Sequence, residues 1–309
     1  MIPPRDFYLG ALVLRGLSHW IDSEMAMLTT RRAEDINQGA LEFLQDRGGA
    51  EAPFLLFLNY MDAHEPHTPG SPFKEMFPGK MPLYELVTLR SRKNEINSGK
   101  REMQLWEQEH IMAQYDAGIV AEDSAIGELI DTLKELGLYE NTLIVVTADH
   151  GHAIGEHGYL GHGLGTVYQE EVHIPLLVKY PGQQDAARAD FPVSQVDLLP
   201  TILDTVGINL PSASLPGQSL RQPVPGATFT EAVSYDYPPR KPLLAGVRHA
   251  MFEGPRKLIV WSDGEPELYD LSEDPGEQDN LYNPDDPDTQ EMLTRLNSWI
   301  ATQSHSSGE

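Results

Sequence analysis

The densest group of chemically capable side chains lies between Thr147 and Gly163, in the stretch TADHGHAIGEHGYLGHG. Asp149 and His150 place an oxygen donor beside a nitrogen donor, and Gly151 lets the chain turn sharply after them. The stretch begins where an apolar run ends, and ligands bind at the carboxyl ends of strands in open α/β sheets. These donors suit a divalent metal, so we predict that Asp149 and His150 bind one. The alternative is a histidine-rich surface loop without a ligand.

A second polar stretch, NYMDAHEPHTP over residues 59–69, also follows an apolar run. If both runs are strands of one parallel sheet, His64 and Asp149 open onto the same crevice. A histidine placed there can hydrogen-bond an anionic substrate or protonate a leaving group. The alternative is a proline-rich turn that contains an incidental histidine.

The elements that must position these groups follow an α/β pattern. Three unbroken apolar runs predict buried strands, at 53–60, 141–148 and 174–180. Helical spacing of apolar residues predicts three helices, at 31–47, at 106–136 and, capped by Asp197, at 197–206. A strand, a helix and a strand in that order form a βαβ unit, which implies a parallel sheet and a right-handed crossover.

The character of the chain changes after about residue 210. Four short strands are expected, at 228–233, 243–251, 257–261 and 267–271, and a final amphipathic helix at 289–302. The predicted fold class is therefore α/β, a sheet with flanking helices over residues 1–210, followed by an antiparallel α+β subdomain over 211–309.

Two acidic pairs carry less weight as candidate site residues. Glu122 and Asp123 are expected on a solvated helix face, and Glu170 and Glu171 are expected to cap or line the site.

Composition excludes several classes of function. The 309 residues hold 22 Lys and Arg against 47 Asp and Glu, and the net charge of −25 repels nucleic acids and anionic lipid surfaces. The absence of cysteine excludes disulfides, cysteine-ligated zinc and a cysteine nucleophile encoded in this chain. With only eight lysines, the acidity indicates either a protein of a salty cell interior or an acidic mesophilic protein. No run reaches the about 18–20 apolar residues of a membrane span, and no secretory leader is recognisable, so the chain as written would be cytoplasmic.

The combination of motifs resembles the sulfatase family, within the alkaline phosphatase superfamily. The most specific block reads TADHG…GEHG…GHG…YQEEVHIPLLVKYPG. The resembling stretches cover most of the chain after residue 30, at 53–69, 115–129, 141–182, 193–211 and 267–281. The resemblance implies an alkaline-phosphatase-like sheet and hydrolysis of sulfuric esters.

The resemblance also implies roles for single residues. Asp149 and His150 match the family's second pair of metal ligands, for Ca²⁺ in most members, with Mg²⁺ or Mn²⁺ as alternatives. His64 matches the histidine that contacts substrate, and His162 stands where many members have a lysine that touches the sulfate. The implied partner is a small anionic ester, for example a sulfate ester on a sugar. In the family, a formylglycine matured from Cys or Ser attacks the sulfur.

The family's N-terminal region, with its paired aspartates and its C/S-x-P-x-R nucleophile motif, has no match in this sequence. We therefore expect a truncated sulfatase-type hydrolase that is inactive and poorly soluble as this chain. One alternative is another reaction of the superfamily, namely phosphodiester or phosphonate hydrolysis or phosphoryl transfer. The other is a non-catalytic binding module that keeps the crevice without the chemistry.

Overall fold

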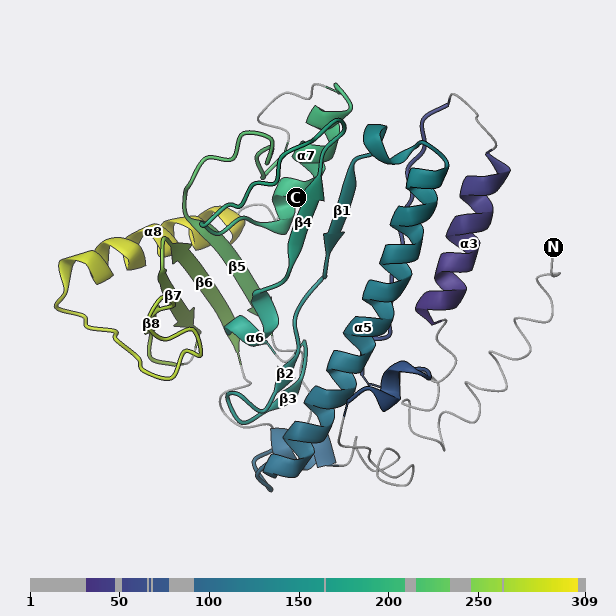
Figure 1. Ribbon diagram of the computed structural model, residues 1–309. Helices are drawn as coiled ribbons and strands as arrows, with labels where there is room; N and C mark the ends of the chain where they lie inside the picture. The colour runs from purple at the N-terminus through teal and green to yellow at the C-terminus, as the bar shows by residue number, and fades with distance from the viewer. Residues whose placement is uncertain are drawn as a thin grey trace. The chain divides into compact units, whose positions relative to one another are not determined.

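The computed structural model describes nine stretches of the chain, namely residues 32–47, 52–65, 67, 69–77, 92–163, 165–208, 215–233, 246–262 and 264–304. The chain folds into two compact units (Figure 1). The first comprises residues 1–139 with 158–160, and the second comprises residues 140–157 with 161–309. The predicted division near residue 210 is a different partition and stays a prediction.

The first unit is built on two long helices. These are α3 (Ala33–Asp46) and α5 (Leu105–Glu135), with the short 3₁₀ helix η1 (Phe73–Glu75) also packed on α5. α3 lies alongside α5 (Figure 1), and the buried Asn37 amide donates to the Ala125 carbonyl at 2.9 Å and to Glu128 Oε2 at 2.8 Å. Both predicted helices are confirmed within two residues at each end.

The apolar run at 53–60 does not form the predicted buried strand. It has no regular secondary structure, and the side chains of Leu55 and Phe57 are 84% and 86% exposed. No strand within the described stretches is hydrogen-bonded to it. An apolar run is buried on both faces only when neighbouring strands and helices cover it, and that condition is not encoded in the run itself.

The second unit contains the strands around the predicted metal loop. In chain order its elements are β1 (Ile144–Thr147), β2 (Ala153–Ile154), α6 (Gln169–Val172), β4 (Leu176–Lys179), η3 (Gln195–Asp197) and α7 (Leu198–Thr205). Two further short elements, η2 (Tyr139–Asn141) and β3 (Leu160–Gly161), each begin with a residue of the first unit. The strands predicted at 141–148 and 174–180 are therefore confirmed as β1 and β4. They pair antiparallel, with Ile144 opposite Lys179 and Thr147 opposite Leu176, so the expected parallel arrangement is wrong for this pair.

Asp197 occupies the predicted N-cap position of α7, but its side chain makes no capping hydrogen bond to that helix. It is the last residue of η3, where its Oδ2 accepts the Ser194 N–H at 2.9 Å. Its other oxygen accepts the Gln218 N–H at 2.9 Å and ties the following loop to α7. The predicted helix itself is present, with Pro200 tolerated in its first turn.

The C-terminal part of the second unit forms the predicted antiparallel sheet. Its strands are β5 (Thr228–Val233), β6 (Val247–Glu253), β7 (Arg256–Trp261) and β8 (Glu267–Asp270), in that spatial order, and α8 (Pro287–Ser304) lies against β6 (Figure 1). Met251, Leu258 and Leu296 are completely buried in the core between sheet and helix. Within the described residues, no helix is both long and apolar enough to cross a membrane.

Candidate functional site

The predicted metal ligands lie directly after β1. Asp149 and His150 are exposed, with His150 Nε2 3.6 Å from Asp149 Oδ2. His150 Nδ1 lies 2.8 Å from the Gly151 carbonyl oxygen, which favours a proton on Nδ1 and leaves the Nε2 lone pair beside the carboxylate. The Gln195 amide donates to the carbonyls of Ala148 and Asp149, at 2.8 and 3.0 Å, and holds this end of the strand.

His162 contacts His150 and His152, while its predicted contact with a sulfate oxygen stays a prediction. Its ring stacks on His150 with centroids 4.4 Å apart, and its Nδ1 lies 3.2 Å from His152 Nδ1. A carboxylate and an imidazole lone pair fit a divalent cation. Asp149 and His150 supply two donors. Within the described stretches, no third His, Cys, Asp or Glu joins them in a cluster with metal-binding geometry.

Helix α6 fixes the position of the loop that carries the predicted metal ligands. The Gly151 N–H donates to the Glu171 carbonyl at 2.7 Å, and a Cβ on Gly151 would lie 2.1 Å from the Glu170 carbonyl oxygen. Only glycine allows this approach. Burial raises the pKa of the Glu171 carboxyl to about 7, against the opposing hydrogen bond from Thr166. The expectation that Glu170 and Glu171 line the site is thus consistent with their backbone contacts.

His157 connects α6 to the C-terminal part of the chain. Its Nδ1 lies 2.6 Å from Glu170 Oε1, its Nε2 lies 3.1 Å from the Glu277 carbonyl oxygen, and its ring stacks on Tyr168 at 3.8 Å. Burial opposes protonation of this imidazole, but the hydrogen bonds and charges of Glu170 and Glu277 together outweigh burial, and the pKa of His157 is raised. Sequence reasoning did not single out His157, although it lies inside the motif block.

One face of the C-terminal sheet carries buried charges that sequence reasoning also missed. Arg248 and Lys257, on β6 and β7, are completely buried. Arg248 donates to the Gly165 carbonyl at 2.5 Å, and Tyr168 donates to Glu267 of β8 at 3.0 Å, so this face lies against the motif segment. The sequence did carry a sign of this burial, since Lys257 and the apolar Ile259 are two residues apart and therefore share one face of the strand. Lysine is so seldom buried, however, that its presence suggests a solvated face.

In the first unit, the loop that carries His64 is held against α5. The Ala63 N–H donates to Glu122 Oε1 at 3.0 Å, and a Cβ on Gly118 would lie 2.3 Å from the Asp62 carbonyl oxygen. Burial raises the pKa of Glu122, with the hydrogen bond from the Ala63 N–H opposing it, so Glu122 does not lie on a plain solvated face as expected. His64 and Asp149 lie in different units, and their common crevice stays a prediction.

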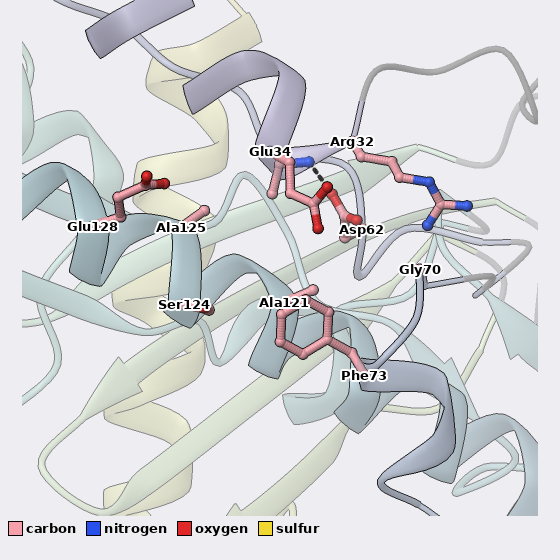
Figure 2. A pocket seen from close by; sticks show the side chains of 10 residues that line it. Arg32, Glu34, Asp62, Gly70, Phe73, Ala121, Ser124, Ala125 and Glu128 are labelled. Atoms are coloured by element: carbon pink, nitrogen blue, oxygen red, sulfur yellow. Dashed lines mark hydrogen bonds between the residues drawn. The ribbon is translucent and has the colours of Figure 1, made fainter. Parts of the chain in front are cut away.

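A cavity of about 150 Å³ lies beside this loop at the start of α3 (Figure 2). The Asp62 carboxylate accepts the Ala33 N–H at 2.7 Å, drawn as the dashed line in Figure 2, and so caps α3. The remaining labelled lining residues are Arg32, Glu34, Gly70, Phe73, Ala121, Ser124, Ala125 and Glu128. Asp62, two residues before His64, therefore contacts both helices of the unit. Its carboxylate binds the start of α3, and its carbonyl oxygen lies against Gly118 of α5.

We expect His67 to make the first unit sensitive to acid. His67 is 4% exposed, and its burial lowers the pKa to about 4 from the ordinary 6.5. Its stabilising contribution is therefore present above pH 6.5 and is lost as the pH falls toward 4, by about 2 kcal/mol at pH 5. His67→Asn removes the titrating group and tolerates the left-handed backbone at φ 53°. Urea denaturation at pH 7.5 and pH 5 should show a weaker loss of stability in this variant.

The exposed His173 provides the control for this comparison. His173→Asn should keep the pH dependence of the unchanged protein. Equal acid sensitivity of His67→Asn and the unchanged protein would show that His67 does not dominate the titration.

Comparison with known proteins agrees with the motifs. The family described as Sulfatase matches residues 18–208, more than half of the chain, and the family described as N-sulphoglucosamine sulphohydrolase, C-terminal, matches residues 155–306. An N-acetylglucosamine-6-O-sulfatase from Bacteroides thetaiotaomicron is 32% identical over 190 residues, which are 57% of this chain and 33% of that protein.

Solved structures confirm the fold class. A phosphonate monoester hydrolase from Silicibacter pomeroyi matches with a TM-score of 0.64 and 26% identity, over 89% of this chain and 61% of that chain. A protein solved in complex with its substrate D-glucosamine-2-N,6-O-disulfate matches with a TM-score of 0.53 and 25% identity, over 74% and 49%. The chain spans about half the length, or less, of the curated relatives it matches. From its motif block and from these matches, the chain belongs to the sulfatase family.

Proposed function

We propose that this chain supplies the metal-binding part of the active site of a metal-dependent sulfuric ester hydrolase. The observation that carries the proposal is the stacking of His162 on His150, 4.4 Å apart, directly beside Asp149. It brings three residues with family-matched roles into one group within one unit of the protein. Ca²⁺ is the proposed cation, with Mg²⁺ and Mn²⁺ as alternatives.

Each residue has a role that follows from its chemistry. The Asp149 carboxylate and the His150 Nε2 lone pair bind the cation, which when bound neutralises charge on the ester oxygens. His162 donates a hydrogen bond to a sulfate oxygen in place of the family's lysine. His64 contacts the substrate from the loop that Gly118 and Glu122 hold on α5.

The proposed substrate is a small sulfate ester on a sugar. Support comes from the N-acetylglucosamine-6-O-sulfatase and from the protein solved with D-glucosamine-2-N,6-O-disulfate, which are similar to this chain. The sequence contains no cysteine and no serine within an S-x-P-x-R motif. We therefore expect these 309 residues alone to bind the cation and sulfate esters without turning the esters over.

Calcium binding tests the proposal directly. Titration calorimetry of the chelator-treated protein with CaCl₂ should show one saturable site, and Asp149→Ala should weaken it at least about tenfold, equivalent to about 1.4 kcal/mol. The exposed Asp185 has no side-chain contact among those described, so Asp185→Ala removes the same charge as a control and should leave the affinity unchanged. Equal effects of the two substitutions would refute a site at Asp149.

A second candidate is phosphonate ester hydrolysis, favoured by the match to the phosphonate monoester hydrolase. Competition between glucosamine 6-sulfate and phenyl phosphonate for the calcium-loaded protein separates the two. Tighter binding of the phosphonate would replace the sulfatase proposal. Binding of either ligand without turnover in a longer form of the chain would favour a binding module.

A further inference from the structure

The face of the C-terminal sheet opposite α8 holds a buried ion pair. Lys257 Nζ lies 2.5 Å from Glu277 Oε1, and both side chains are fully excluded from solvent. Lys257 points to the same face as Phe252 and Tyr269, its cross-strand neighbours on β6 and β8. A charge pair in such a place contributes little to stability, because its desolvation offsets its attraction. Its presence therefore calls for another explanation.

Glu277 makes two further contacts that both lead to α6. Its Oε2 accepts the N–H of Gln169, the first residue of α6, at 2.6 Å. Its carbonyl oxygen lies 3.1 Å from Nε2 of His157, whose Nδ1 contacts Glu170 in the same helix. Helix α6 has only four residues and depends on such partners to keep its place.

The backbone of Glu277 supports a specific role for its carboxylate. Its φ is 52°, in the left-handed region that glycine adopts without strain. Glutamate at this position retains the strain and supplies the carboxylate that joins Lys257 to α6. Among the described residues, His67 is the only other non-glycine residue with a positive φ.

The last step runs from α6 to the metal loop. Gly151, directly after Asp149 and His150, donates its N–H to the Glu171 carbonyl at 2.7 Å and packs against the Glu170 backbone. We propose that the Lys257–Glu277 pair is a positioning element that holds α6, and through it the Asp149–His150 loop, in the geometry that binds the cation. The metal part of this inference rests on the proposed function.

A double substitution separates positioning from stability. Lys257→Met with Glu277→Met removes both charges at similar volume, so thermal stability should stay within a few degrees of the unchanged protein. Two measurements should nevertheless change. Hydrogen exchange of the 149–158 peptide, which contains the Gly151 amide, should accelerate at least tenfold, and calcium affinity should fall at least tenfold.

The partly exposed pair of Arg295 and Glu253, on α8 and β6, is the matched control. Arg295→Met with Glu253→Met should change neither exchange at 149–158 nor calcium affinity. A stable Lys257/Glu277 double variant with unchanged exchange and affinity would overturn the positioning role.

A double variant that does not fold, or an unchanged protein that binds no calcium, requires a second measurement. If the double variant does not fold, Glu277→Gln keeps an acceptor for the Gln169 N–H but removes the charge, and exchange at 149–158 should still accelerate. Unchanged exchange in this variant would also overturn the inference. If the unchanged protein binds no calcium, the proposed function fails, while the exchange measurement still decides the positioning role.

Discussion

Lys257→Met alone is expected to lower the free energy of unfolding by about 3–5 kcal/mol. The substitution leaves the Glu277 carboxylate without its cation in a position where neither side chain is exposed to solvent. Burial already raises the pKa of Glu277, against the opposing attraction of Lys257, and it lowers the pKa of Lys257. Thermal or urea unfolding at pH 7.5 measures the loss.

The loss should shrink as the pH falls. A carboxyl whose folded pKa is raised favours folding in its protonated form, so its penalty is smallest at low pH and grows as the pH rises through that pKa. Arg295→Met breaks a pair in which both side chains are about 40% exposed, and it should cost no more than about 1 kcal/mol. Similar losses for the two substitutions would mean that Lys257 is not desolvated in solution.

Gly118→Ala is expected to destabilise the first unit by about 3 kcal/mol. The added Cβ would lie 2.3 Å from the Asp62 carbonyl oxygen and 2.9 Å from the Ala63 Cα, both backbone atoms that cannot move alone. The loop that carries His64 must shift away from α5 to relieve the overlap. Differential scanning calorimetry measures the effect on stability, and the exchange rate of the 61–67 peptide reports the displacement of the loop.

Gly127 of the same helix is the matched control. A Cβ there meets nothing within 4 Å, and Gly127→Ala should stabilise the protein by about 0.5–1 kcal/mol through helix propensity alone. Opposite signs for two identical substitutions in one helix isolate the contact with Asp62. Stabilisation by both would show that the loop does not rest on α5.

Local patterns predicted most elements of this protein. Helical periodicity located α3 and α5 to within two residues, short strand-like runs located β5 through β8, and an apolar helix face located α8. These signals act over one or two turns of chain, which is why they can be read from sequence. The same patterns left strand pairing open, and β1 and β4 proved antiparallel although their apolar composition suggested a parallel sheet.

The run at 53–60 shows the limit of composition most clearly. Its unbroken apolar composition is typical of a buried strand, yet the run forms no strand, and Leu55 and Phe57 are exposed. Strand formation needs a hydrogen-bonding neighbour, and no residue of the run specifies one.

By itself the sequence determined the sulfatase family and the residues whose side chains suit a metal and an anionic ester, because donor types and spacing are properties of a short stretch. Only the tertiary structure decided what supports them. Glu277 reaches Gln169 across 108 residues, and Glu122 reaches Ala63 across 59. Whether a charge is desolvated or a glycine is needed depends on atoms that such distant segments bring together, and no local pattern carries that information.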